Sequence, residues 1–87
     1  MRKITCEVVN TKGMHARAAA HIVSHVCQFE SQVILRHRDK SAPGDSLIKL
    51  LTLNAPKGSM IEIQVEGIDE DKVIDDLESL FKKGFGE

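Results

Sequence analysis

The chain has 87 residues, which suffices for one compact domain but not for two domains with separate cores. Its 12 basic and 13 acidic side chains nearly cancel, and it contains no Trp, no Tyr and only 3 Phe. We therefore expect no nucleic-acid binding, because the chain offers neither a basic surface nor aromatic platforms for stacking bases. With 41% hydrophobic residues, it is expected to form a single globular domain over residues 1–87.

Uninterrupted apolar runs span only a few residues, whereas a membrane-spanning helix needs about 20. Glu7 also falls where a signal peptide would carry its apolar stretch. These features predict a cytoplasmic protein that does not bind membranes. Cys6 and Cys27 both fall at core-periodic positions, so we predict two buried, reduced thiols without a redox or metal role.

The first half of the chain predicts two strands and one helix. Residues 4–8 alternate apolar and polar side chains, as in a half-buried strand. A polar turn at residues 10–13 separates them from a helix over Ala16–Gln28, where apolar residues recur at helical spacing. Residues 31–38 predict a second strand, and residues 39–44 are a turn region with room for one short strand.

The second half predicts a short helix, a strand and a longer helix. Ser46 is a good capping residue for an apolar helix over Leu47–Leu53. Ile and Val alternate with Glu and Gln over residues 61–65, the clearest strand pattern in the chain. From Asp69 to Lys83 the apolar residues again follow a helical period, with acidic residues in the first turn and lysines at the end.

This order of elements predicts an α+β fold of two layers. Helices with one apolar stripe each would cover one face of a mostly antiparallel sheet. The opposite face of the sheet is expected to be exposed to solvent, because it would carry the polar residues Thr5, Glu7, Glu62, Gln64 and Glu66. Folds of this kind serve many functions, so the function must be argued from a site.

The strongest candidate site lies where the first helix begins. If this helix starts at Ala16, His15 occupies the capping position, and the N–H groups of the first turn form an anion site near its ring. The positive end of the helix dipole favours the neutral imidazole, which can attack phosphorus. The guanidinium of Arg17 suits phosphate oxygens, and Gly13 allows a sharp turn before the site. This pattern indicates phosphoryl transfer through histidine, although two polar surface residues beside a helix would have the same spacing.

A resemblance to a known family covers essentially the whole chain. Residues 13–20, G-M-H-A-R-A-A-A, resemble the active-site segment of the histidine-containing phosphocarrier (HPr) family of the phosphoenolpyruvate-dependent phosphotransferase system. Residues 45–53, D-S-L-I-K-L-L-T-L, resemble the segment that holds this family's regulatory serine. Residues 55–63, residues 66–70 and the terminal G-F-G-E resemble its last strand and helix.

The resemblance implies an open-faced sandwich with three helices on one side of a four-stranded antiparallel sheet. It implies that His15 accepts a phosphoryl group on Nδ1 from phosphorylated Enzyme I and passes it to an IIA component. Arg17 would pair with the phosphoryl oxygens, and a serine kinase or phosphorylase would act at Ser46. The implied protein is a monomer that relays the group without independent enzymatic turnover and without a cofactor.

The resemblance also implies an apolar patch that both partner proteins contact. The segment 47–53 is apolar nearly all round, so some of its side chains must be exposed, and exposed apolar residues mark an interaction surface. The patch would consist of Met14, Ala16, Leu47, Ile48 and Leu51.

Three positions depart from the family pattern. Ala18 replaces the usual proline, which a first helical turn would tolerate. Asp45 stands where many members carry a lysine or a neutral residue, and Lys49 replaces a small residue. A carboxylate beside Ser46 could hinder a kinase, so this serine is predicted as a helix cap with a regulatory role left open.

The remaining histidines are not predicted to be functional. His21 and His25 are four residues apart, which is metal-ligand geometry in principle, but no Cys or acidic residue accompanies them locally. We therefore expect solvated helix residues and no metal site. His37 lies at a strand end with no role to assign.

Three alternatives to a sugar-uptake phosphocarrier stay open. G-M-H-A-R together with L-L-T-L looks like a nitrogen-regulatory branch of the same family. A small phosphatase would need a water-orienting side chain and more phosphate-binding donors than residues 10–13 supply. A metal-binding module would need a Cys/His cluster, which the two cysteines do not provide.

Overall fold

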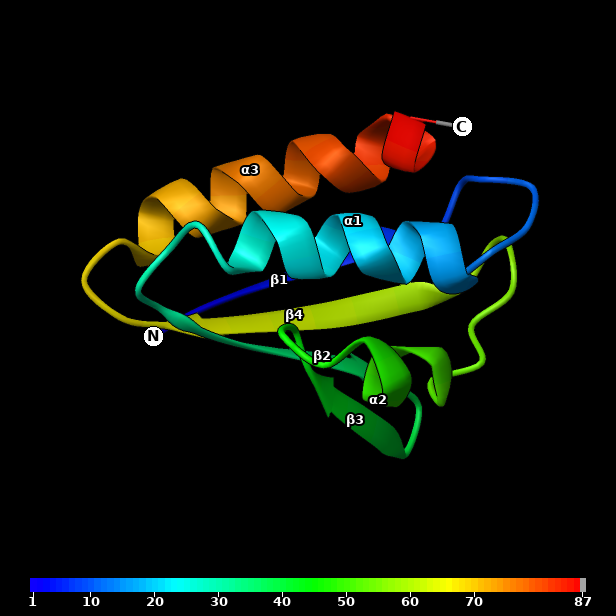
Figure 1. Ribbon diagram of the computed structural model, residues 1–87, viewed down its shortest axis with the longest axis horizontal. Coiled ribbons are helices and arrows are strands. Elements are labelled where there is room, and N and C mark those ends of the chain that lie inside the picture. Colours follow the sequence, from blue (N-terminus) through cyan, green and yellow to red (C-terminus); the bar gives the residue numbers. More distant parts are fainter. Residues whose placement is uncertain (87) are drawn as a thin grey trace.

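The computed structural model describes residues 1–86, so Glu87 of the terminal G-F-G-E lies outside the described residues. Its four strands form one sheet in the order β1-β4-β2-β3, and every neighbouring pair is antiparallel (Figure 1). The strands are β1 (Arg2–Glu7), β2 (Gln32–His37), β3 (Lys40–Pro43) and β4 (Met60–Glu66). The turn region between the second and third predicted strands therefore does contain a short strand, β3.

Three α-helices accompany the sheet, as the sequence predicted. They are α1 (Ala16–Val26), α2 (Leu47–Leu51) and α3 (Glu70–Lys82), followed by a single 3₁₀ turn, η1 (Gly84–Gly86). Helices α1 and α3 lie side by side over the sheet, and α2 lies beside α1 near β3 (Figure 1). The predicted open-faced α+β sandwich is confirmed, although α1 and α2 each end two residues earlier than expected.

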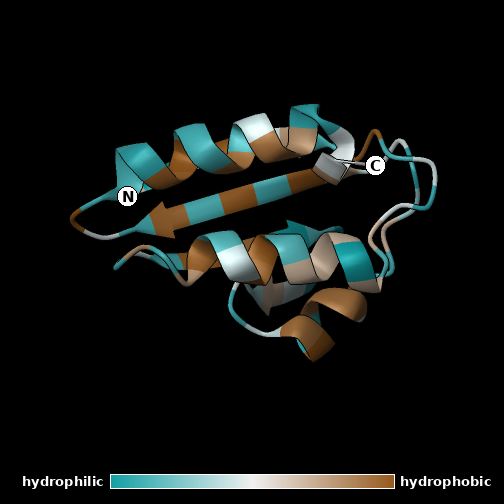
Figure 2. Cartoon of the chain, turned by 45° about the horizontal axis from the view of Figure 1, so that its top comes forward, coloured by the Kyte–Doolittle hydropathy of each residue, from teal (hydrophilic) through white to brown (hydrophobic). Residues whose placement is uncertain are grey.

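Strand β4 explains why the sheet has one apolar and one polar face. Ile63 of β4 is fully buried and pairs with Ile4 of β1 and Leu35 of β2. The alternation along β4 is visible in Figure 2, where apolar and polar residues succeed one another. The outer face is polar as predicted, with exposed or half-buried side chains at Thr5, Glu7, Glu62, Gln64 and Glu66.

Helix α3 buries the apolar stripe that its sequence predicts. The buried side chains of this stripe are Val73, Ile74, Leu77, Leu80 and Phe81. The ring of Phe81 packs edge-on against that of Phe85, with 4.8 Å between the ring centroids. This contact holds the 3₁₀ turn η1 against the end of α3 (Figure 1).

The two cysteines differ, and the prediction that both are buried is wrong for Cys27. Cys6 of β1 is buried, whereas Cys27 is exposed because it caps the end of α1, beyond the stripe that faces the core. Burial raises the pKa of the Cys6 thiol, and the nearby Glu78 carboxylate adds to this effect. Cys6 is therefore a protonated core residue at neutral pH.

Within the described residues, no helix has the length and apolar character needed to cross a membrane.

Candidate functional site

His15 caps the N-terminus of α1, as the sequence predicted. Its backbone is extended (φ −102°, ψ −176°), so the chain turns into the helix immediately after it. The ring nitrogen Nδ1 accepts a hydrogen bond from the backbone N–H of Arg17, with 3.3 Å between the two nitrogens. The imidazole is partly exposed, and its Nδ1 lone pair faces the start of the helix.

The turn before His15 is held by two hydrogen bonds and by the conformation of Gly13. The N–H of Met14 donates to the carbonyl of Ala55 at 2.8 Å, and the side-chain amide of Asn10 donates to the carbonyl of Gly13 at 2.7 Å. Gly13 adopts φ +69°, and a Cβ atom on it would lie only 2.5 Å from the Ala55 oxygen. Only glycine fits this conformation and this approach, so the position of His15 depends on Gly13.

Sequence reasoning missed two of these supporting residues. Asn10 is buried, and its side-chain amide stabilises the turn through the hydrogen bond to Gly13. The sequence did contain a signal for this role, because Asn favours turns through its side-chain amide. Ala55 is also buried and lies 41 positions along the chain from Met14, so nothing local could indicate its role. The loop that carries Ala55 is brought to the site only by the tertiary fold.

The first turn of α1 provides the anion-binding groups. The first N–H bonded within this helix is that of Ala19, which donates to the carbonyl of His15 at 2.9 Å. Earlier amides of the turn point toward the capping residue, at the positive end of the helix dipole. Arg17, in the same turn, is exposed, and its guanidinium is a bidentate donor suited to phosphate. The arrangement can hold an anion bonded to Nδ1 of His15.

Ser46 caps α2 in the way that the sequence predicted. Its Oγ accepts a hydrogen bond from the backbone N–H of Lys49 at 3.4 Å. The side chain is half-buried, and its neighbour Asp45 is exposed. The structural role of Ser46 is thereby accounted for without any modification.

Helix α2 exposes apolar side chains, as its sequence predicted. Leu47 is 41% exposed, Ile48 75% and Leu51 37%, whereas Leu50 is fully buried. Figure 2 shows the helix as hydrophobic along nearly its whole length. Ala16, on the first turn of the neighbouring helix α1, is also exposed. We call Ala16, Leu47, Ile48 and Leu51 the apolar patch.

Met14 does not belong to this surface, so its predicted place in the apolar patch requires correction. Only 6% of the residue is exposed, because its side chain belongs to the core cluster. Its backbone N–H is engaged by Ala55 as well. The buried side chain of Met14 therefore anchors the turn that precedes His15 and does not offer a surface to partner proteins.

Two of the three other histidines have hydrogen-bond partners, which corrects the prediction for His25. His21 is exposed as expected, but His25 is half-buried, with Nδ1 2.6 Å from Oδ2 of Asp76 on α3. His37 lies with Nδ1 3.0 Å from the carbonyl oxygen of Leu53. Among the described residues, no group of three or more His, Cys, Asp and Glu side chains could hold a metal ion.

The fold and the site together define a class of protein: a small two-layer domain with a histidine at a helix N-terminus, suited to carrying a phosphoryl group. The family model for the PTS HPr component phosphorylation site matches residues 2–83. The chain therefore belongs to the HPr family of the phosphotransferase system, and it is a phosphocarrier.

Named relatives agree over nearly the full length. The chain is similar to a phosphocarrier protein NPr of Proteus mirabilis, with 42% identity over 81 residues, covering 92% of this chain and 90% of the relative. It is also similar to a phosphocarrier protein HPr of Neisseria meningitidis, with 36% identity over 87 residues, covering 100% and 98%. A crystal structure of HPr from Thermoanaerobacter tengcongensis superposes with a TM-score of 0.94 at 32% identity, again covering 100% and 98%.

This family membership decides between the classes that the sequence left open. A phosphocarrier is supported over a small phosphatase or a metal-binding module. The partners are components of the phosphotransferase system.

Proposed function

We propose that His15 is the residue that carries the phosphoryl group and that Arg17 stabilises it. The observation that carries this proposal is the orientation of the His15 ring, whose Nδ1 accepts from the backbone N–H of Arg17. A phosphoryl group bonded to Nδ1 would use the lone pair that now accepts this hydrogen bond. The phosphoryl oxygens would then accept the hydrogen bond from the Arg17 N–H instead. The Arg17 guanidinium would add a second, charged donor.

Transfer to His15 is a displacement at phosphorus. The Nδ1 lone pair forms the new bond to phosphorus while the bond between phosphorus and the donor breaks, and the bonding electrons return to the donor. The second transfer runs the same way, with Nδ1 of His15 as the leaving group. Neither step needs a cofactor, and a group held on the surface suits a protein that has to fit two different partners.

In this proposal the donor is phosphorylated Enzyme I and the acceptor is an IIA component, and the relay operates in the cytoplasm. Both partners would contact the apolar patch, because exposed apolar side chains next to a reactive group favour transient docking. The chain would act as a monomer, which stays a prediction, since HPr of Thermoanaerobacter tengcongensis has also been crystallised as a dimer.

A serine kinase or phosphorylase acting at Ser46 would regulate this docking. A phosphate on Ser46 would stand directly before Leu47 and Ile48, so it would weaken docking by desolvation and charge repulsion without unfolding the helix. The substitution Ser46→Asp tests this idea. Phosphorylation of His15 by Enzyme I should slow down in this variant, and an unchanged rate would count against regulation at this position.

A nitrogen-regulatory branch of the family is a second candidate role. The 42% identity with a protein named NPr favours it, whereas a 36% match to a protein named HPr favours the sugar branch. Competition between a nitrogen-branch and a sugar-branch IIA component for the phosphorylated chain distinguishes the two, because the faster acceptor identifies the branch.

Mass spectrometry after incubation with phosphoenolpyruvate and Enzyme I tests the central proposal. We expect one added phosphoryl group that is labile in acid and stable in base, as a phosphoramidate is and phosphoserine is not. His15→Ala should abolish it, whereas the matched control His21→Ala, on the exposed side of the same helix, should retain it. Retention of the group in His15→Ala would refute the assignment.

A further inference from the structure

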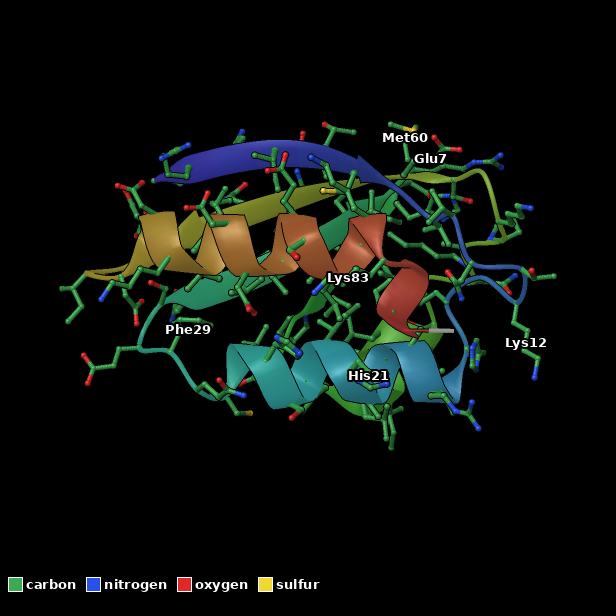
Figure 3. The ribbon with its side chains drawn as sticks, turned by 90° about the horizontal axis from the view of Figure 1, so that it is seen from above. Glu7, Lys12, His21, Phe29, Met60 and Lys83 are labelled. Atoms are coloured by element: carbon green, nitrogen blue, oxygen red, sulfur yellow. The ribbon has the colours of Figure 1, made fainter. Side chains whose placement is uncertain are left out.

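A basic hollow of about 460 Å³ opens between the β1–α1 loop and the end of α3. Four cationic side chains line it: Lys12 from the loop, Arg17 from α1, and Lys82 and Lys83 from α3. Figure 3 shows Lys12 extending from the tip of the loop and Lys83 at the end of α3. The hollow therefore joins three separate segments of the chain, and Arg17 belongs both to it and to the phosphoryl site.

The end of α3 and the β1–α1 loop lie close together at Gly84. A Cβ atom on Gly84 would lie 3.5 Å from Cβ of Asn10 and 3.6 Å from Cγ2 of Val9, which is van der Waals contact. The β1–α1 loop and the end of α3 therefore form a concave surface, and the lysine side chains extend from these two segments. The fold brings these four residues to one hollow although they are up to 71 positions apart in the chain.

Among residues 1–86, no acidic residue lines this hollow, and none of its four cationic residues forms an ion pair. The protein as a whole carries a formal charge of −1, so these side chains represent a local concentration of positive charge and not a general excess. Cations gathered without counter-charges produce a field that attracts anions.

The size and lining of the hollow indicate the class of ligand. Its volume lies within the range of about 300–1,000 Å³ that is usual for small-molecule sites, which exceeds the need of one phosphate group. Six of its eight lining residues have polar or charged side chains, which disfavours a wholly apolar cofactor. Lysine ammonium groups and an arginine fork are the side chains that bind phosphates. Because cations stand on both walls, a ligand with several negative groups would contact both at once.

We propose that this hollow binds a small organic molecule of the di- or polyphosphate class, and that binding inhibits phosphorylation of His15. The inhibitory part rests on the proposed function. A polyphosphate that engages Arg17 withdraws this guanidinium from the phosphoryl group on His15 and repels the incoming phosphoryl donor. The site would thereby make the relay sensitive to the concentration of an anionic metabolite.

Titration with tripolyphosphate, followed by the amide chemical shifts of the full chain, tests the binding. Shifts should concentrate in residues 9–12, Arg17 and residues 82–84, and inorganic phosphate should bind more weakly. Lys82→Gln/Lys83→Gln should weaken binding of tripolyphosphate by at least about tenfold. The control Lys57→Gln/Lys72→Gln removes the same charge from exposed positions outside the hollow and should weaken it by less than about twofold.

Equal weakening in the two double variants would overturn the site, because it would indicate attraction to net charge alone. A peptide of glutamates that binds more tightly than tripolyphosphate would also overturn the proposal, since the hollow would then suit an acidic protein segment.

The inhibition is measured as the rate of His15 phosphorylation by phosphorylated Enzyme I with and without tripolyphosphate. The wild-type rate should fall, and the Lys82→Gln/Lys83→Gln rate should fall much less, while the two rates without tripolyphosphate stay similar. Equal inhibition of both proteins would refute the inhibitory role. A chain that is not phosphorylated at all would instead refute the proposed function, so the two failures are distinguishable.

Discussion

Helices α1 and α2 both begin with a side chain that caps the first turn, and they differ in what surrounds this cap. In α1, Nδ1 of His15 accepts from the N–H of Arg17 at 3.3 Å, and in α2, Oγ of Ser46 accepts from the N–H of Lys49 at 3.4 Å. Helix α1 has 11 residues and buries a full apolar stripe, whereas α2 has 5 residues and buries only Leu50. A side-chain cap thus belongs to the proposed phosphoryl acceptor on a well-packed helix and to a stabilising residue on a marginal one.

The difference lies in tertiary support, which positions the proposed phosphoryl acceptor of α1 more firmly than the cap of α2. The approach to His15 is fixed by the backbone contact of Met14 with Ala55 and by the side chain of Asn10. The approach to Ser46 is a turn in which its N–H donates to the Pro43 carbonyl at 3.2 Å. A long helix with packed neighbours can use its first residue for chemistry, because its stability does not depend on that residue.

Breaking the turn in front of α1 should have the largest effect. Gly13→Ala forces a side chain into a left-handed conformation and against the Ala55 oxygen, and we expect a loss of about 2 kcal/mol or more in unfolding free energy. Gly58→Ala is the matched control, because Gly58 also has a positive φ (+91°) but no atom within 4 Å of the added Cβ. Chemical denaturation of both variants measures the difference, and equal losses would show that the close approach to Ala55 costs nothing.

Removing the cap of α2 should have a smaller effect. Ser46→Ala leaves the Lys49 N–H without its acceptor and should lower stability by about 1 kcal/mol, which is a fall in Tm of roughly 4–8 °C. Ser24→Ala, in the exposed middle of α1, should change stability by no more than about 0.5 kcal/mol. If both serines gave the same Tm shift in thermal melts, the capping role of Ser46 would be wrong.

Restoring the usual family residue in α1 should have little effect. Ala18 lies in the first helical turn, before the first residue whose N–H is bonded within the helix. Ala18→Pro therefore removes no helical hydrogen bond and should change the unfolding free energy by at most about 1 kcal/mol in either direction. Ala18 is fully buried, so a larger loss in a thermal melt would reveal a steric clash of the proline ring with the core.

The start of α3 provides a pH-dependent contrast to the cap of α2, because the capping hydroxyl of Ser46 does not titrate in this range. The Asp69 carboxylate accepts hydrogen bonds from the Ser31 hydroxyl and from the backbone N–H of Glu30, at 2.9 Å for the latter. These bonds, that of Ser31 foremost, hold the pKa of Asp69 below its usual value of 3.8. A lowered pKa means that this stabilisation is complete above the unfolded-state pKa and is lost as the pH falls through the folded-state pKa.

Asp69→Asn should therefore lower the Tm at pH 7 and have progressively less effect below about pH 4, where the wild-type carboxylate takes up its proton. Thermal melts of both proteins between pH 7 and pH 2 measure this convergence. A constant Tm difference over the whole range would mean that the ionised carboxylate contributes nothing.

Much of the fold could be predicted because its elements have strong local signals. The alternation of Ile61, Ile63 and Val65 defines β4, and the stripe that ends at Phe81 defines α3. Cys27 was mispredicted because helical periodicity alone does not say where a helix ends. His25 was mispredicted because its partner Asp76 is 51 positions away along the chain. His15 and Arg17 could be proposed as a site from the sequence because they belong to one short motif. Asn10 and Ala55 could not, because they contribute by holding the turn that precedes His15.

The amino-acid order by itself determined the kinds of elements, the capping residues and the family, because period, turn chemistry and motif spacing are properties of short segments. Only the tertiary structure decided that Met14 lies inside, that Ala55 supports the turn and that Lys82 and Lys83 join Arg17 around one hollow. The physical reason is that each of these facts depends on contacts between segments far apart in the chain, which packing in three dimensions alone brings together.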